Sequence, residues 1–355
     1  MTDKKIKIHI RNNHWKAGSL PCDLEGEINN TITKEIFEKK LKVFPEVKDK
    51  IEYLIDWDDD NFESSLSNSD ILLGWNFPTK EIKNIAPNLK WIHVISAGVN
   101  HLYPFDWMSE KCVLTNSSGV HAKKAGEFGL MSILMLQSHI TKIVTNQKNK
   151  EFISLLSKPI AGKKVIVVGT GSLGGSMIKH IAKLDVEVIG VNRKGRSVDG
   201  CSKVITFDKI DEVLPVADFL YLAVPQTNET IGLIDKKRLD MLKPSCGIVN
   251  IGRETVLDYK SLCEKLKNNE IAGAILDVFS QEPIPKDSEL WDTPNLIITP
   301  HVSSDSVENA NGVREEYNRN YELTLTGATC SLRTKTFEVL RPKVNPSEKV
   351  PLTVV

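Results

Sequence analysis

Apolar and polar positions alternate along this chain with two different periods. Short apolar runs, typical of strands with both faces buried, are separated along most of the chain by segments whose apolar positions recur at helical spacing. Such alternation is typical of parallel sheets covered by helices, so the pattern predicts an α/β fold. A length of 355 residues exceeds what one hydrophobic core usually supports, so we expect two domains.

The first part of the chain predicts one small open sheet. Its strands are expected at 6–10, 51–55, 71–73 and 91–95, and its helices at 33–44 and 79–85. A proline-free apolar segment from 122 to about 144 then predicts one long, largely buried helix that leads between the domains.

The later part of the chain carries a longer series of strand-like runs, which suits a doubly wound parallel sheet. These runs lie at 164–168, 186–191, 203–206, 219–223, 247–251, 274–278 and 296–299. From these patterns we expect a first domain at 1–121, completed by 305–330, and a second domain at 151–304. We expect an interdomain helix and link at 122–150 and a C-terminal extension at 331–355.

Composition narrows the class of protein. The 46 basic residues equal the 46 acidic ones, so no overall field favours nucleic acid or an acidic membrane surface as a partner. Six scattered cysteines form no C-x-x-C pair and no metal-ligand spacing, which favours a reduced protein without a metal site. With no apolar signal core and no stretch of ~20 apolar residues, the sequence predicts a cytoplasmic protein.

A glycine motif marks a candidate nucleotide site. The apolar run Val165-Ile-Val-Val168 leads into Gly169-Thr-Gly-Ser-Leu-Gly174, and a helical pattern and a second strand follow. Gly169 permits the tight turn, Gly171 lets the backbone approach a pyrophosphate, and Gly174 allows close helix packing. Ser172 and Leu173 would begin the helix whose free N–H groups receive the phosphates, so the segment predicts dinucleotide binding.

The end of the second strand distinguishes between the two nicotinamide cofactors. An NAD site normally has an acidic residue there, but this chain has Asn192, followed by Arg193, Lys194 and Arg196. These cations could pair with a 2′-phosphate, although they could also simply occupy an exposed loop. The sequence therefore favours NADP over NAD.

Three further segments place reactive groups directly after predicted strands: Asn250-Ile-Gly-Arg253, Leu276-Asp-Val-Phe-Ser-Gln-Glu-Pro283 and Thr299-Pro-His301. The carboxyl ends of parallel strands are where open α/β sheets bind ligands. Alone, each arginine, glutamate or histidine would more often be structural. The three segments therefore mark candidate site residues at one edge of the predicted sheet.

From about Ser69 to Tyr321 the chain resembles the D-isomer-specific 2-hydroxyacid dehydrogenase family. The resemblance is carried by Trp91-Ile-His-Val-Ile-Ser-Ala-Gly-Val99, the glycine motif, the segments at 217–230 and 274–279, and the motifs ending at Arg253, Pro283 and His301. It implies a smaller flavodoxin-like substrate domain beside a Rossmann-like cofactor domain. It also implies a homodimer that transfers a hydride between NAD(P)H and the C2 carbonyl of a small 2-oxo acid, as glyoxylate/hydroxypyruvate reductases do.

The resemblance assigns catalytic roles to three residues. Arg253 would hold the substrate carboxylate and carbonyl, His301 would pass a proton to or from the C2 oxygen, and Glu282 would orient and charge His301. Hydride arriving at a carbonyl builds negative charge on oxygen, which an adjacent proton donor and a fixed cation stabilise. A carboxylate beside an imidazole favours its protonated form.

Further binding residues are expected from the same comparison. Ser96, Ala97, Gly98 and Val99 would form an anion nest for the substrate carboxylate, and Trp75 would either face the substrate side chain or simply pack. Asp277 would hydrogen-bond the nicotinamide carboxamide. The other expected cofactor-binding residues flank the same site: Val224, Pro225, Thr230, Ile251, Gly252 and Ser303.

Three positions depart from the family pattern, and the function keeps alternatives. Glu254 stands where glycine is common, Asn100 where aspartate is common, and Ser303 where glycine or alanine is frequent. The alternatives are a non-catalytic NAD(P)-sensing scaffold of the corepressor type and a short D-3-phosphoglycerate dehydrogenase. A formate dehydrogenase is disfavoured, since such enzymes usually carry glutamine where this chain has Glu282.

Overall fold

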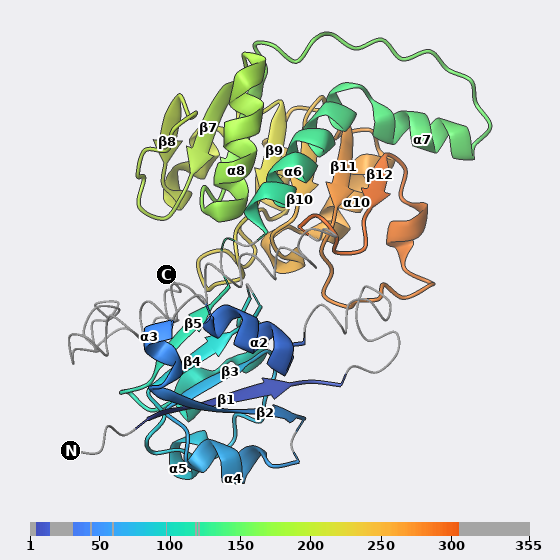
Figure 1. Ribbon diagram of the computed structural model, residues 1–355. Coiled ribbons are helices and arrows are strands. Elements are labelled where there is room, and N and C mark those ends of the chain that lie inside the picture. Colours follow the sequence, from blue (N-terminus) through green and yellow to red (C-terminus); the bar gives the residue numbers. More distant parts are fainter. Residues whose placement is uncertain are drawn as a thin grey trace. The chain divides into compact units, whose positions relative to one another are not determined.

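The computed structural model describes residues 5–14, 31–42, 45–58, 60–96, 98–117, 119 and 121–304. The chain divides into two compact units, the second of which begins at His121 (Figure 1). The expected completion of the first domain by 305–330 and the extension at 331–355 lie outside the described residues.

The sheet of the first unit is parallel throughout and has the strand order β2-β1-β3-β4-β5. This flavodoxin-like order confirms the fold class expected for this unit, and it places the reversal of strand order between β1 and β3. The strands are β1 (Ile6–Asn12), β2 (Ile51–Trp57), β3 (Ile71–Gly74), β4 (Trp91–Val94) and β5 (Val113–Asn116).

Two apolar cores cover the two faces of this sheet. Ile8 and Ile10 of β1 pack with Phe37 of α2 (Lys34–Leu41) on one face. On the other face, Leu72 packs with Phe62 of α4 (Phe62–Ser67), and the same core includes Ile82 of α5 (Ile82–Ile85). The remaining short helices are α3 (Pro45–Lys48), η1 (Asn100–Leu102) and η2 (Phe105–Trp107). Because side chains alternate across a strand, β3 contributes to both cores, with Ile71 and Leu73 on one face and Leu72 on the other.

The second unit is built on a seven-stranded parallel sheet of order β12-β11-β10-β9-β6-β7-β8. This doubly wound order confirms the Rossmann-like prediction. The strands are β6 (Lys164–Val168), β7 (Glu187–Val191), β8 (Lys203–Ile205), β9 (Phe219–Leu222), β10 (Gly247–Asn250), β11 (Gly273–Leu276) and β12 (Leu296–Ile298).

Helices cover both faces of this second sheet. α6 (Ala122–Gln137) and α8 (Ser172–Ile181) pack against each other and enclose one core with Val165, Val167 and Tyr221. α9 (Lys236–Asp240) and α10 (Tyr259–Lys267) enclose the other core, which contains Ile166, Leu220 and Ile248. Five 3-10 turns complete the described part of the unit: η3 (Ala182–Leu184), η4 (Phe207–Glu212), η5 (Leu214–Val216), η6 (Glu254–Val256) and η7 (Glu289–Asp292).

The prediction of one long helix from 122 to about 144 is wrong. α6 ends at Gln137, and α7 (Ile140–Lys148) begins after His139, which has a positive φ of 56°. The two helices are bent by 67°, and this bend lets α7 pack on β11 and β12, where the Thr145 hydroxyl accepts the Asn295 N–H at 2.7 Å. Within the described ranges no single helix is long and apolar enough to cross a membrane, and α6 and α7 meet that test only as this bent pair.

Candidate active site

The glycine loop after β6 has the shape that a dinucleotide requires. Gly169 has φ 93°, and a side chain there would collide with the Ala223 backbone. Gly174 lies directly against the Gly169 carbonyl, whereas a Cβ on Gly171 would meet nothing within 4 Å. Gly171 also caps α8 without a side chain, so the N–H groups of the first helical turn have no side-chain cap. The residues present therefore fit a pyrophosphate at this helix terminus.

Asn192 lies at the end of β7, and its side chain holds the following loop. Its amide nitrogen donates to the Thr170 hydroxyl at 2.9 Å and to the Arg196 carbonyl at 3.0 Å, while its oxygen accepts the N–H groups of Lys194 and Arg196. Arg193, Lys194 and Arg196 are exposed, and no carboxylate in the described part of the chain forms an ion pair with them. The loop thus presents three cations beside the end of β7.

The backbones of the loops after β9 and β10 contact each other beside the glycine loop. A Cβ on Gly252 would collide with the Val224 carbonyl, so these two loops approach as closely as their backbones allow. The buried Thr230 hydroxyl donates to the Pro225 carbonyl at 2.6 Å and accepts the Thr227 N–H at 2.8 Å, which fixes the loop after β9. Ile251 is buried in the core under these loops.

Asp277, fully buried at the end of β11, anchors the loop that carries His301. One carboxylate oxygen accepts the Thr299 hydroxyl at 2.5 Å and the Val302 N–H at 3.0 Å, and the other accepts the Ser303 N–H at 3.0 Å. His301 itself has φ 55°, an uncommon backbone conformation for a residue with a side chain. The Asp277 carboxylate therefore holds the loop in a shape it would not adopt by preference, as is often found at functional sites.

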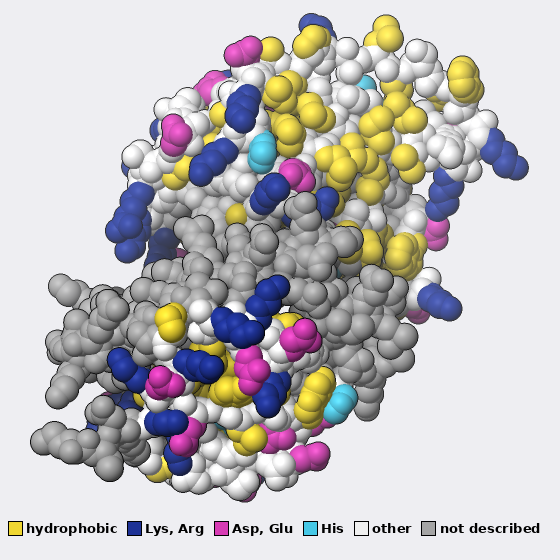
Figure 2. All heavy atoms as spheres, viewed as in Figure 1, with side chains coloured by type: hydrophobic (Ala, Val, Ile, Leu, Met, Phe, Trp, Pro, Cys, Tyr) yellow, Lys and Arg dark blue, Asp and Glu magenta, His cyan; other side chains and the backbone are white. Residues whose placement is uncertain are grey.

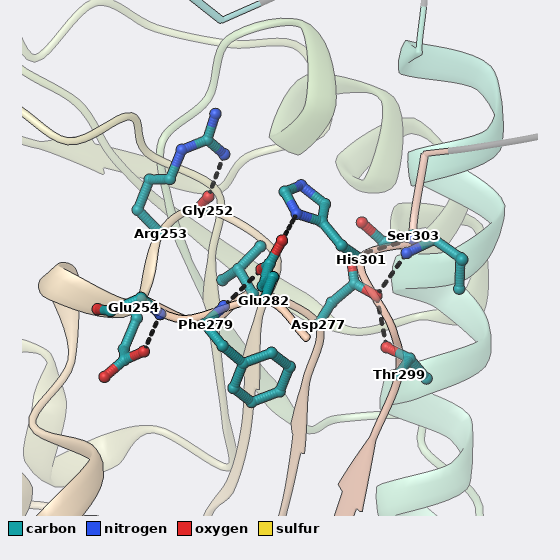
Figure 3. A network of polar contacts seen from close by, with 12 residues as sticks. Gly252, Arg253, Glu254, Asp277, Phe279, Glu282, Thr299, His301 and Ser303 are labelled. Carbon is teal, nitrogen blue, oxygen red and sulfur yellow. Dashed lines mark hydrogen bonds and ion pairs between the residues drawn. The ribbon is translucent and has the colours of Figure 1, made fainter. Parts of the chain in front are cut away.

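His301 and Glu282 form a hydrogen-bonded pair (Figure 3). The imidazole Nδ1 lies 2.8 Å from Glu282 Oε2, and Glu282 Oε1 accepts the Phe279 N–H at 2.8 Å. About a third of each side chain is exposed. The pair is therefore partly exposed, and Nδ1 is the ring nitrogen that Glu282 holds.

Arg253 extends from the neighbouring strand end. Figure 3 shows its guanidinium and the His301 imidazole projecting in the same direction beyond the strands. Its Nη1 donates to the Gly252 carbonyl at 2.6 Å, which leaves other donors of the fork for a ligand. Burial lowers the pKa of Arg253, and the Glu282 charge opposes this shift, so the guanidinium stays cationic.

The charges around the pair favour a protonated imidazole. The hydrogen bond to Glu282 raises the pKa of His301; burial and the Arg253 charge oppose this shift, and the charges of Glu282 and Asp277 add to it. Burial alone would raise the pKa of Glu282, but the hydrogen bonds from His301 and Phe279 and the charges of His301 and Arg253 lower it overall. The site can therefore present a carboxylate, an imidazolium and a guanidinium together.

In the first unit, the predicted nest follows β4. The Ser96 hydroxyl donates to the Gly98 carbonyl at 2.6 Å, and the Ser96 carbonyl accepts the Ser117 N–H. Val99 packs against an apolar core of this unit, and Ala97 lies outside the described residues. Trp75 is half-buried, and its carbonyl accepts a hydrogen bond from His101 Nε2 at 2.9 Å. The roles of these residues in substrate binding stay predictions.

Sequence reasoning missed several contacts that support the reactive groups. The Tyr259 hydroxyl of α10 forms hydrogen bonds with the loop after β10 and with the loop after β11. The Glu254 carboxylate accepts the Ser280 N–H. Glu254 had stood out only as a departure from the family, and nothing in the pattern marked Tyr259. Among the described residues, no group of three or more His, Cys, Asp or Glu side chains could hold a metal ion.

Comparison with known proteins agrees with this geometry. Residues 130–303 match the family model "D-isomer specific 2-hydroxyacid dehydrogenase, NAD binding domain". The chain is 31% identical to the glyoxylate reductase of Thermofilum pendens over 277 residues, which is 76% of this chain and 81% of that protein.

Two solved structures show the same fold. A D-isomer specific 2-hydroxyacid dehydrogenase family protein from Aeromonas salmonicida is 26% identical, with a TM-score of 0.68 over 90% of this chain and 96% of that one. A D-isomer specific 2-hydroxyacid dehydrogenase from Xanthobacter autotrophicus, solved with NADPH and MES, is 23% identical, with a TM-score of 0.71 over the same shares.

The fold, the glycine loop and the comparisons define an NAD(P)-dependent oxidoreductase that acts on 2-oxo and 2-hydroxy acids. The chain belongs to the D-isomer-specific 2-hydroxyacid dehydrogenase family, and its second unit is the NAD(P)-binding domain.

Proposed function

We propose that the protein reduces a small 2-oxo acid such as glyoxylate with NADPH, using Arg253, Glu282 and His301. The observation that carries this proposal is the 2.8 Å contact between His301 Nδ1 and Glu282, next to Arg253 at the carboxyl edge of the sheet that also carries the glycine loop. The Thermofilum relative, named a glyoxylate reductase, supports the substrate class.

The proposed chemistry follows from the protonation states. Bound NADPH supplies the hydride to C2 of the substrate. Glu282 holds the Nδ1–H of His301, so the proton on Nε2 is directed toward the C2 oxygen as charge develops there. The Arg253 fork binds the planar carboxylate through parallel donors and adds positive charge beside the same oxygen.

Loss of NADPH absorbance with a panel of acceptors tests this function. We expect saturable turnover with glyoxylate and hydroxypyruvate and weaker turnover with larger 2-oxo acids. The panel includes 3-phosphohydroxypyruvate, since a preference for it would favour the short D-3-phosphoglycerate dehydrogenase. NADPH binding without turnover of any acceptor would favour the non-catalytic scaffold.

The cofactor preference is a second proposal, in which Arg193, Lys194 and Arg196 select NADPH through its 2′-phosphate. Asn192 adds no negative charge there, and its side chain already holds this loop. We expect the Arg193→Ala change to lower kcat/KM for NADPH by about 10- to 100-fold, the range of a charge-assisted hydrogen bond, while kcat/KM for NADH stays within about twofold. Equal wild-type kcat/KM values for the two cofactors would contradict the preference.

We also propose that the protein is a homodimer joined through the second unit. The segment 149–160 arches away from this unit between α7 and β6 (Figure 1), and Phe152 and Leu156 on it are almost entirely exposed. Figure 2 shows hydrophobic side chains gathered where Figure 1 draws α6 and α7, and the exposed large hydrophobic residues of these two helices and of the segment 149–160 are Met131, Leu134, Ile143, Val144, Phe152, Ile153 and Leu156. An exposed apolar patch of this kind marks an interface, and in a twofold dimer the same patch of each subunit would face the other.

Light scattering after size exclusion measures the oligomeric state. We expect a dimeric wild type and a monomeric Phe152→Asp/Leu156→Asp double variant, because each subunit would bring two charges into the buried interface. Val216→Asp is the matched control, since Val216 is exposed outside this patch. A monomeric wild type, or a double variant that stays dimeric, would refute the proposed interface.

A further inference from the structure

Two of the proposed catalytic groups stand on loops from neighbouring strands, and side chains outside the catalytic set tie these loops together. Arg253 follows β10, and Glu282 follows β11, and the two strands pair in parallel. Both loops leave the sheet at the same edge. The last paired residues of the two strands are Asn250 and Leu276, so strand pairing does not fix the distance between the loops after these residues.

The Asn250 side chain shapes the first loop. Its oxygen accepts the Gly252 N–H at 3.0 Å, and its amide nitrogen donates to the Arg253 carbonyl at 3.0 Å. These two bonds close the turn between the end of β10 and Arg253. The backbone of Arg253 is thus held by a buried side chain.

The Tyr259 hydroxyl then joins this turn to the second loop. It accepts a hydrogen bond from the Asn250 amide at 3.1 Å and donates to the Val278 carbonyl at 2.8 Å. Burial raises the pKa of Tyr259 well above 10, so the phenol keeps the proton it donates. The Tyr259 ring packs edge-on against Phe279, whose N–H is bonded to Glu282.

A second contact crosses the same gap. The Glu254 carboxylate, one residue after Arg253, accepts the Ser280 N–H, two residues before Glu282. Tyr259 and Glu254 therefore connect the Arg253 loop with the Glu282 loop at two points, one buried and one at the rim (Figure 3 shows the Glu254 side).

We infer that Tyr259 and Glu254 are positioning residues, which set the distance between Arg253 and the His301–Glu282 pair and so determine how tightly the substrate carboxylate binds. This inference rests on the proposed function of those three residues. Neither Tyr259 nor Glu254 needs to touch the substrate, since each acts through the backbone of a loop. A change of about 1 Å in the distance between two such groups can lower the reaction rate about 100-fold.

The Tyr259→Phe change tests the buried connection, because it keeps the ring and removes only the hydroxyl. We expect kcat/KM for glyoxylate to fall about tenfold through a higher KM, since the Val278 carbonyl loses its partner and the Arg253 turn loosens. Tyr53→Phe is the matched control: it removes one tyrosine hydrogen bond, to Glu38 in the first unit, and is expected to leave both constants unchanged.

The rim contact is tested by a pair of changes at Glu254. Glu254→Gln keeps an oxygen that can accept the Ser280 N–H, so it is expected to retain a KM within about twofold of wild type, whereas Glu254→Ala is expected to raise KM about fivefold. An equal effect of both changes would show that the charge, and not the hydrogen bond, matters, and would overturn the role inferred for Glu254.

Amide hydrogen exchange, measured by NMR on the full chain, separates this inference from the proposed function. The Gly252, Phe279 and Ser280 N–H groups are bonded within the two loops. We expect Tyr259→Phe to speed exchange at all three, while amides of the β6–β7 pair stay as slow as in wild type. If exchange and KM in Tyr259→Phe match those of Tyr53→Phe, the inference is wrong. A wild type without turnover would refute the proposed function, and exchange would still decide whether the two loops are connected through Tyr259.

Discussion

Replacing His301 with glutamine is expected to lower kcat for glyoxylate reduction by about a hundred- to ten-thousandfold, the usual contribution of a positioned proton donor. Glutamine keeps a hydrogen-bond donor but cannot release a proton to the substrate oxygen. The affinity for NADPH, measured by fluorescence titration, should change little, because the glycine loop is formed by other strand ends. His180→Gln, on α8, is the matched control and should keep wild-type kcat.

The pH dependence supplies an independent measurement of the same residue. The pKa of His301 is raised, first by its hydrogen bond to Glu282, and reduction requires the protonated imidazole. Activity should therefore be present at low pH and be lost as pH rises through the raised pKa of His301. In Glu282→Gln the negative charge is absent, so this alkaline loss should begin at lower pH. An alkaline limb at the same pH in both proteins would contradict the role of Glu282.

Replacing Arg253 with alanine should lower kcat/KM for glyoxylate by about 100- to 1000-fold, because a donor to the developing charge and the carboxylate fork are lost together. Arg253→Lys should recover only part of this loss, since an ammonium keeps the charge without two parallel donors. Steady-state kinetics over a wide glyoxylate range measures both changes.

The control for Arg253 is another arginine of the second unit that lies in an ion pair. Arg238 bonds Asp211 at 2.6 Å, so Arg238→Ala should alter thermal stability without altering KM for glyoxylate. Wild-type kcat/KM in a folded Arg253→Ala variant would remove Arg253 from the proposed site.

Much of the fold could be predicted from the sequence because buried parallel strands appear as continuous apolar runs. The strands at 71–74 and 219–222 are fully buried in the structure and were visible as such runs. β5 was missed because its sequence, Val-Leu-Thr-Asn, is not a continuous apolar run, and α4 was missed because the six residues Phe62–Ser67 are too few for a helical period to show. The break at His139 was missed because it depends on how α7 packs against β11 and β12, which no local pattern records.

The reactive groups of the candidate site could be proposed from the sequence, but their supports could not. Motifs after strands pointed to Arg253, Glu282 and His301, because parallel strands end at one edge of the sheet. The Asp277 carboxylate anchors residues 22 to 26 positions further along the chain, and the bridge through Tyr259 joins residues 9 and 19 positions apart. Such contacts depend on side-chain directions in the folded sheet, so periodicity and motif spacing cannot reveal them.

Deuterium transfer tests the central claim most directly. The protein is incubated with glyoxylate and NADPH that carries deuterium at C4 of the nicotinamide on the transferred face, and the product is analysed by mass spectrometry. The proposed function predicts glycolate with one deuterium at C2, formed rapidly by wild type and far more slowly by His301→Gln. Glycolate without the label, or labelled product formed equally fast by both proteins, would contradict it.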